Sequence, residues 1–283
     1  MNHIYRLIWS ELSNAWVAVA ESASGRGKGS SRKLVAAALS LCAATGQAGP
    51  MDGHVVSGVG SISQSGATTT IQQSSPNLSL DWKSFNVAPQ ETVNFLQPSA
   101  AAIAVNRILD TNGTQILGQL NANGQVWLVN PNGILFGQGA RIDVAGLIAS
   151  TLDLHDAGLS GNARTFSGDG PGSIVNRGTI NAANGGYVAL LGNTVSTQGT
   201  ISARLGTVAL AAGNAATLTF SGNSLVKMQV DRSVLASLAE NGGLINADGG
   251  TVVMNAGAKN ALLASVVNNT GVIEARTVEN HQG

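Results

Sequence analysis

Acidic and imidazole side chains gather at one place in this chain, between positions 153 and 156. Asp153, His155 and Asp156 offer two carboxylates and an imidazole, which are groups that bind divalent cations. No further ligand lies nearby in the sequence, so we expect a solvated loop here. The sequence also lacks the Gly-x-Ser-x-Gly, P-loop, His-Glu-x-x-His and paired-cysteine motifs. We therefore predict no catalytic residue, no cofactor-binding residue and no metal site.

A second kind of chemistry would be polysaccharide cleavage, which uses aspartates and basic residues clustered on one face of a parallel β-helix. The candidates here are Arg141, Asp143, Asp231 and Arg232. They are too scattered to support such a site, so the sequence predicts that the chain is not an enzyme. A β-helical polysaccharide-active enzyme remains the alternative function.

The elements that would position any side chain appear as a repeated phrase in the C-terminal half. Its four copies are Gly178-Thr-Ile-Asn-Ala, Gly199-Thr-Ile-Ser-Ala, Gly243-Leu-Ile-Asn-Ala and Gly271-Val-Ile-Glu-Ala. Successive isoleucines are 21, 44 and 28 residues apart. The step of 44 fits two turns of a solenoid, and the step of 28 fits one turn plus a loop. A period of 20 to 30 residues is typical of stacked solenoid repeats.

The repeated phrase alternates apolar and small polar residues with a period of two, which predicts short β-strands. No helical period is present, so a parallel β-helix is favoured and an antiparallel β-sandwich is the alternative. The composition agrees, because 36 glycines and only 4% aromatic residues suit stacked small side chains. With a net charge of zero and no basic patch, the chain is not expected to bind nucleic acid.

Short strands are also predicted upstream of the repeats, over 81–87, 93–96, 103–108, 115–120, 125–129, 134–136, 141–144 and 147–154. A turn is expected over 121–124. A second turn is expected at Asn130-Pro131-Asn132-Gly133, where Pro at the second position and Gly at the fourth fit a type I turn. This turn is either only a corner of the fold or also part of a recognition signal, and the two readings are compatible. Trp82, Phe85, Asn86 and Trp127 are predicted to anchor the cap and the strands.

The first 48 residues are predicted to be a targeting segment. Leu34–Ala44 is an apolar run too short to span a bilayer, and Arg32-Lys33 precede it. Cleavage is expected after Ala48, with Ala44 as the alternative. Cys42 follows Leu41 rather than a small residue, so lipidation is not expected. Its removal would leave a mature chain without cysteine, which suits passage through an oxidising compartment.

The residues before this run also carry a pattern. These residues could form an amphipathic helix, or the start codon could be assigned too far upstream. They closely resemble, however, the extended signal peptide region of large Gram-negative exoproteins. His3 replaces the usual lysine of that pattern. The matching residues are Asn2, Tyr5, Arg6, Trp9, Trp16, Val17, Val19 and Glu21. The resemblance implies a Gram-negative envelope and Sec-dependent export.

Residues 53–154 resemble the two-partner secretion domain of filamentous haemagglutinins and high-molecular-weight adhesins. The matching strings, in order, are Trp82-Lys-Ser-Phe-Asn-Val, Ala104-Val-Asn-Arg-Ile, Gly118-Gln-Leu-Asn-Ala-Asn-Gly-Gln-Val, Asn130-Pro-Asn-Gly-Ile-Leu-Phe-Gly and Ala149-Ser-Thr-Leu-Asp. The Asn-Pro-Asn-Leu motif of some relatives is missing, since Ser75-Pro-Asn-Leu78 lies upstream of Trp82. The chain is thus more similar to the high-molecular-weight adhesin branch.

This resemblance implies a right-handed parallel β-helix with an N-terminal cap and extra-helical hairpins. It divides the chain into an extended signal peptide (1–48), a secretion domain (49–160) and the start of a β-helical shaft (161–283). It implies secretion to the cell surface or medium through an outer-membrane transporter whose periplasmic domains bind the chain. The Sec machinery and signal peptidase are further partners, and host cell-surface glycans are a candidate.

An autotransporter passenger is a third possibility, but nothing resembles its membrane barrel. Because the chain stops at His281-Gln-Gly283 just after a repeat begins, a fragment of a longer protein is expected.

Overall fold

The computed structural model describes residues 5–10, 15–20, 49–155, 159, 161–232, 237–256 and 266–276. All regular elements in these ranges are β-strands, so none of the described residues forms a helix that could cross a membrane. The chain separates into two units, Met1–Ala44 and Thr45–Gly283, each of which is described by itself.

The first unit contains one antiparallel strand pair. Strand β1 (Tyr5–Ser10) pairs with β2 (Ala15–Ala20), with Tyr5 opposite Ala20 and Ser10 opposite Ala15. The alternative of an amphipathic helix is therefore wrong for these two ranges. The expected cleavage residue Ala48 and the apolar run with Cys42 lie outside the described residues.

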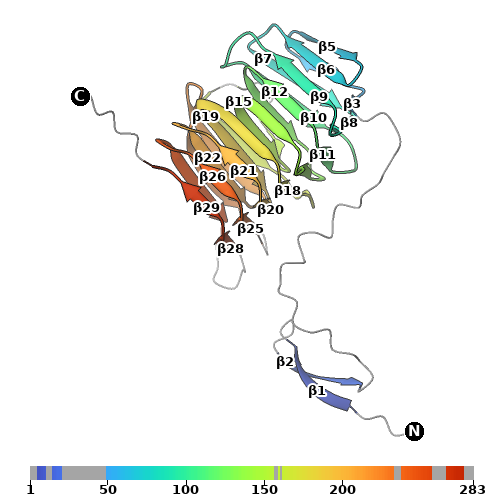
Figure 1. Cartoon of the computed structure of the whole chain (residues 1–283), viewed down its shortest axis with the longest axis vertical. Coiled ribbons are helices and arrows are strands. Elements are labelled where there is room, and N and C mark those ends of the chain that lie inside the picture. The colour runs from blue at the N-terminus through green and yellow to red at the C-terminus, as the bar shows by residue number, and fades with distance from the viewer. Residues whose placement is uncertain are drawn as a thin grey trace, which may run out of the picture. The chain divides into compact units, whose positions relative to one another are not determined.

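The second unit is a stack of coils in which a complete coil contributes one short strand to each of three walls (Figure 1). The first wall contains β6 (Thr68–Gln73), β9 (Thr92–Leu96), β12 (Gln119–Ala122), the first halves of β15 (Arg141–Ser150) and β19 (Thr179–Gly192), β21 (Thr200–Ser202), β26 (Leu244–Asn246) and β29 (Val272–Glu274). The second wall contains β7 (Asn77–Trp82), β10 (Ile103–Ile108), β13 (Gln125–Val129), the second halves of β15 and β19, β22 (Thr207–Ala212) and β27 (Thr251–Ala256). The third wall contains β11 (Thr114–Ile116), β14 (Ile134–Phe136), β18 (Ser173–Asn176), β20 (Thr194–Thr197), β25 (Leu238–Asn241) and β28 (Val266–Asn269).

Successive coils pair in parallel and place like residues on like. The repeated isoleucines form one ladder, in which Ile180 pairs with Ile201, Ile201 with Ile245 and Ile245 with Ile273. Ile142 continues this ladder toward the N-terminus. The first three of the repeated isoleucines and Ile142 are fully buried inside the coils, so the apolar interior is continuous. The predicted parallel β-helix is confirmed, and the antiparallel sandwich is wrong.

The spacing of 44 residues between two of the isoleucines was misinterpreted as two turns. Because Ile201 and Ile245 are direct neighbours, this step is a single coil that carries an insertion. The step of 28 is one coil plus a loop, as predicted, because Ile245 and Ile273 are also neighbours.

The strand predicted over 115–120 is in fact two strands on different walls, β11 and β12. The chain bends between them at Leu117-Gly118. A Cβ atom at Gly118 would lie 2.2 Å from Ala88 O, so glycine is required where this bend meets the coil before it. Buried and less buried residues alternate without interruption across this bend, so the sequence pattern does not reveal it.

Two corners of the coils differ in character. The corner between the third and first walls, here called the glycine corner, has a glycine at each step. Its stacked glycines are Gly178, Gly199, Gly243 and Gly271, and a Cβ at each of the last three would lie within 2.2 Å of the preceding glycine's carbonyl oxygen.

The corner between the second and third walls, here called the open corner, varies widely in length. It comprises residues 109–113, 130–133, 151–172, 193 and 213–237 in successive coils. The coils remain in register across it, because Gly192 pairs with Ala212 on one side and Thr194 with Leu238 on the other.

The two long versions of the open corner form a four-stranded antiparallel sheet outside the coils, here called the outer sheet. Its strands are β16 (Asp153–Leu154), β17 (Ala163–Ser167), β23 (Ala215–Ser221) and β24 (Ser224–Arg232). These strands are the predicted extra-helical hairpins.

Antiparallel strands also close the N-terminal end of the stack. Strand β3 (Pro50–Met51) pairs with β8 (Ser84–Phe85), β4 (His54–Ser57) with β7, and β5 (Gly60–Ser65) with β6. They form the predicted cap. The coils continue across residue 160, and the division into domains there stays a prediction about function.

Candidate functional site

The predicted turn at Asn130-Pro131-Asn132-Gly133 is present at the open corner between β13 and β14. The Gly133 N–H donates to Asn130 O over 3.0 Å, which closes the turn. The Asn130 side chain supports it, because Asn132 N donates to Asn130 Oδ1 over 2.9 Å. Asparagine is favoured in turns for this local hydrogen bond.

This turn is tied to the coil that precedes it. Asn130 Nδ2 donates to Thr114 Oγ1 over 2.9 Å and to Asn112 O over 3.1 Å. Asn132 Nδ2 donates to Asp110 O over 2.8 Å. Since Asn130 is fully buried, its side chain works within the fold.

The next coil covers the other side of the turn. Gly172 N donates to Pro131 O over 3.1 Å. Gly133 has φ +111°, where side chains are strained, and a Cβ there would lie 3.1 Å from Ser173 O. Of the four turn residues only Pro131 is exposed. A protein that binds this turn directly would therefore contact Pro131.

Trp82 and Phe85 are buried inside the first coils. Their rings meet edge to face at 5.1 Å between centroids. Trp82 Nε1 donates to Asn106 Oδ1 over 2.9 Å, so its one polar atom is paired. Gly53 lies against this indole, because a Cβ there would be 2.2 Å from Trp82 Cζ3. The cap strands thus close directly over Trp82.

Asn86 connects the segment after the cap to the next coil. Its Oδ1 accepts the Gln115 N–H over 2.8 Å, and Val87 N donates to Gln115 O over 2.9 Å. Asn86 therefore holds the edge of β11.

Trp127 occupies a different place from the other anchors. It points outward from β13 and is covered by the outer sheet, where its ring centroid is 6.2 Å from that of Phe166 and 6.1 Å from that of Phe220. Its Nε1 donates to Tyr187 Oη over 2.8 Å. The four predicted anchors consequently do not form one site.

Tyr187 is the central polar group under the outer sheet. Its hydroxyl accepts from Trp127 and donates to Gln125 Oε1 over 2.6 Å. Complete burial raises the pKa of this phenol well above its usual range, and the hydrogen bond from Trp127 lowers it in part. The phenol therefore stays neutral in the folded protein.

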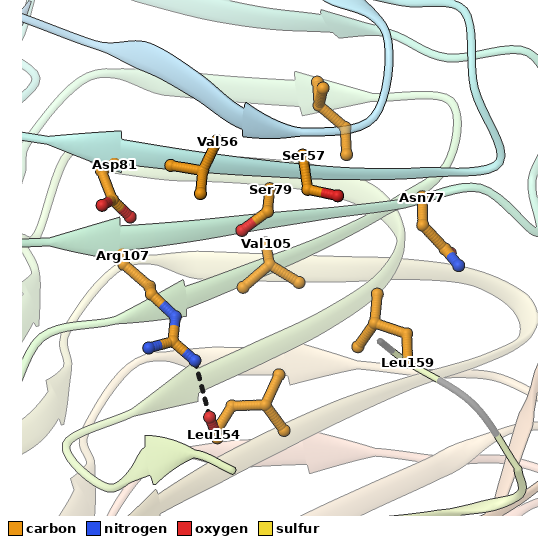
Figure 2. Close-up of a pocket in the computed structure, with 10 residues that line it drawn as sticks. Val56, Ser57, Asn77, Ser79, Asp81, Val105, Arg107, Leu154 and Leu159 are labelled. Atoms are coloured by element: carbon orange, nitrogen blue, oxygen red, sulfur yellow. Dashed lines mark hydrogen bonds between the residues drawn. The ribbon is translucent and has the colours of Figure 1, made fainter. Parts of the chain in front are cut away.

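A groove of about 410 Å³ lies where the outer sheet ends and β7 and β10 are left uncovered (Figure 2). Val105 forms part of its floor, Val56 one side and Leu154 the other. Arg107 lies at one end, where it forms an ion pair with Asp153 at 3.2 Å and donates to Leu154 O over 2.6 Å. Sequence reasoning did not single out Arg107 or Asn106, although both lie in the recognised string Ala104-Val-Asn-Arg-Ile.

The groups first considered for metal binding have other partners. Asp153 pairs with Arg107, and His155 Nε2 lies 2.6 Å from Ser167 Oγ. Asp156 lies outside the described residues. No group of three His, Cys, Asp or Glu side chains in the described part of the chain has the geometry of a metal site.

The carboxylates considered for polysaccharide cleavage lie on different sheets. Asp143 on β15 accepts from Asn181 over 2.8 Å, and Asp231 on β24 accepts from Thr217 over 2.5 Å. Arg141 lies on β15 with Asp143, while the side chain of Arg232 is not among those described. Among the described side chains, Asp143 and Asp231 therefore do not form one carboxylate cluster.

Comparison with protein families gives two matches that together span the chain. The family model described as TPS secretion domain matches residues 46–283. The model described as the extended signal peptide of the type V secretion system matches residues 1–49.

Individual proteins are also similar. A heme/hemopexin-binding protein of Haemophilus influenzae (strain ATCC 51907 / DSM 11121 / KW20 / Rd) is 38% identical over 244 residues, which is 83% of this chain and 26% of that protein. A second H. influenzae protein of the same name is 46% identical over 98 residues, 35% of this chain and 11% of its own length. The chain thus spans about a quarter of the longer match.

Among solved structures, the crystal structure of the HMW1 secretion domain from H. influenzae superposes with a TM-score of 0.70 at 31% sequence identity. The match covers 82% of this chain and 60% of that one.

Proposed function

Because the chain belongs to the family of TPS secretion domains, preceded by an extended signal peptide, we propose that its capped first coils are the signal by which an outer-membrane transporter selects it. The chain is a segment of a two-partner secretion exoprotein, exported by the Sec pathway and secreted to the cell surface of a Gram-negative bacterium. A secretion domain of this family works with an outer-membrane transporter. The proposal divides the mature chain into a recognition region, 49–160, and the start of a shaft, 161–283.

The observation that carries this proposal is the closed N-terminal end of the stack. The cap strands cover Trp82, so the first coils need no earlier coil to pair with. Each later coil then adds to a formed edge in the same register. In a solenoid each repeat contacts only its neighbours, so such growth can proceed as the chain emerges.

The periplasmic domains of the transporter are proposed to hold the chain before it folds. A chain with alternating side chains presents backbone donors and acceptors to a strand edge, and addition of a strand to such an edge is a common way to bind extended peptides. The turn at Asn130 and the strands around it are proposed to be part of what is recognised, with Trp82, Phe85, Asn86 and Trp127 holding the fold that displays them.

Secretion in the presence and absence of the partner transporter tests this function. We expect the exoprotein in the medium only when the transporter is present, and degraded chains in the periplasm when it is missing. Equal amounts in the medium of both strains would refute transporter dependence.

The signal peptide makes a separate prediction. Cleavage after Ala48 would give a mature protein that begins at Gly49, and mass spectrometry of secreted material measures this directly. A secreted protein that retains Met1 would contradict it.

We propose that this segment has no catalytic role, a proposal supported by the separate positions of Asp143, which accepts a hydrogen bond from Asn181, and Asp231, which accepts one from Thr217 on another sheet. Host cell-surface glycans are proposed as ligands of the whole exoprotein, and glycan-array binding of the secreted protein tests this. The similar H. influenzae proteins are named for binding heme and hemopexin. This chain covers 26% of the longer of these proteins.

A further inference from the structure

The outer sheet is built from two insertions that are distant in sequence. The first, in residues 151–172, supplies β16 and β17, and the second, in residues 213–237, supplies β23 and β24. Between them lies a coil whose open corner is Asn193 alone. Strands β17 and β23 nevertheless pair directly, from Ala163 opposite Thr219 to Ser167 opposite Ala215. This sheet therefore links coils that are not neighbours in the stack.

Beneath the outer sheet lies an apolar surface on the outside of the second wall. Its residues come from successive coils and are all buried by the sheet: Trp127, Ile148, Tyr187, Ala189, Leu191, Ala209 and Ala211. Both faces of the second wall are thus apolar, which is expected of a parallel sheet covered on both sides. Without β23 and β24, the part of this surface that β16 and β17 do not cover would face water.

The hairpin of β23 and β24 makes specific contacts on this surface. The Phe220 ring centroid lies 6.1 Å from that of Trp127 and 5.2 Å from that of Tyr187. Thr207 Oγ1 donates to Leu225 O over 2.7 Å, so the hairpin is also bonded to β22. It closes over three coils at once.

We propose that the β23–β24 hairpin is a clasp that closes last over the coils of β13, β19 and β22 and slows their unfolding. The order rests on the proposed function, in which the chain emerges and folds from its N-terminal end. The residues of the apolar surface up to Leu191 and the edge of β17 exist before residues 215–232 arrive. The clasp closes when they do.

The clasp changes how the stack comes apart. A plain solenoid can lose coils one at a time, because each coil contacts only its neighbours. With the clasp closed, the coil of β15 cannot open without also breaking β17 from β23. Loss of one coil is thereby coupled to loss of the next two, which raises the barrier to unfolding.

A deletion can remove the clasp and keep the register. Residues 214–237 are deleted so that Gly213 joins Leu238, which copies the one-residue corner at Asn193. We expect the full exoprotein with this deletion to be secreted by its transporter and to keep the circular dichroism of strands. Its unfolding in denaturant should be about tenfold faster or more, because contacts formed late in folding act mainly on the unfolding rate. An unchanged unfolding rate would overturn the proposal.

Two point variants cover the case in which the deletion prevents folding. Phe220→Ala removes the contact with Trp127 and Tyr187, and Val226→Ala changes a residue of β24 that is 60% exposed. Faster unfolding of the first variant alone is expected, and equal rates would contradict the clasp.

Refolding of the purified secreted protein tests the order. Circular dichroism measures strand formation, and acrylamide quenching of fluorescence measures the burial of Trp127. We expect strand formation to precede the burial of Trp127. Comparison with Trp127→Phe identifies the part of the fluorescence that comes from Trp127. Simultaneous phases would show that the hairpin does not close last. These measurements need no transporter. They can therefore refute the clasp without affecting transporter-dependent secretion, and a loss of transporter dependence would leave the unfolding rates unaffected.

Discussion

The glycine corner and the open corner belong to the same coils, but the first has a nearly constant length and the second varies widely in length. At the glycine corner the chain keeps nearly the same length, and each glycine lies against the carbonyl oxygen of the one before it. At the open corner the length ranges from Asn193 alone to the residues 213–237. Both corners preserve the same register between coils.

This contrast separates two jobs that a solenoid must perform. The glycine corner sets how closely coils approach, because no side chain fits between stacked backbones. The open corner carries the turn at Asn130 and both halves of the outer sheet. The turn and the insertions are therefore placed where they do not change the register of the coils.

The largest effect is expected at the glycine corner. A Cβ at Gly243 would lie 2.0 Å from Gly199 O, whereas at the adjacent Gly242 its nearest neighbour would be Thr270 Oγ1 at 3.6 Å. Gly243→Ala should lower the free energy of unfolding by about 3 kcal/mol, at the top of the range for overpacking. Gly242→Ala should cost about 1 kcal/mol or less. Urea denaturation of both variants measures the difference, and equal losses would mean that the corner can relax.

A smaller effect is expected at the Asn130 turn. Gly133→Val places a β-branched residue at φ +111° and next to Ser173, at an expected cost of about 2–3 kcal/mol. Secretion should fall sharply, because a coil whose corner cannot close cannot pair with the next. The control is Gly222→Val, at φ +59° in the β23–β24 turn with nothing within 4 Å of the added Cβ. If both variants are secreted equally, the turn is neither a required corner nor part of the signal.

The outer sheet predicts an effect that depends on pH. Tyr187→Phe leaves Trp127 Nε1 and Gln125 Oε1 without this partner, which should cost about 1–2 kcal/mol at neutral pH. Folding raises the pKa of Tyr187 above its value in the unfolded chain. The contribution of this phenol to the free energy of unfolding is therefore fully present below a pH of about 10 and is lost as the pH rises further. Denaturation midpoints from neutral to alkaline pH should decline more steeply in the natural protein than in the variant. Parallel curves would show that Tyr187 does not titrate on unfolding.

The smallest effect is expected at the tip of the outer sheet. Asn223 is exposed in the turn between β23 and β24, so Asn223→Ala should change the free energy of unfolding by no more than about 0.5 kcal/mol. Secretion should equal that of the natural protein. A marked loss would make this tip a site of recognition, and the open corner would then carry a second signal.

The stacking of the coils could be predicted from the sequence, whereas the insertions at the open corner could not. Glycine before each repeated isoleucine marks a close approach of backbones, and its regular place made the stack visible. The 44 residues between Ile201 and Ile245 match two turns in length, so length alone predicts two turns where the structure has one coil with an insertion. Only pairing between strands distinguishes an insertion from another coil.

The anchors show the same limit. Trp82 and Trp127 are both buried and both lie in recognised strings, yet one lies inside the coils and the other outside. Where both faces of a strand are covered, alternation does not tell which face is the interior. The turn at Asn130 was predictable because its hydrogen bonds are local, whereas the contact of Arg107 with Asp153 depends on the whole fold.

The one-residue corner at Asn193 has a practical consequence for protein engineering. It lies between two corners that already carry long insertions, and the pairs on either side of the following insertion keep the spacing of the coils. Because β17 and β23 pair across this corner, a longer corner at Asn193 would separate them, so a foreign epitope or binding loop belongs instead at the exposed turn between β23 and β24.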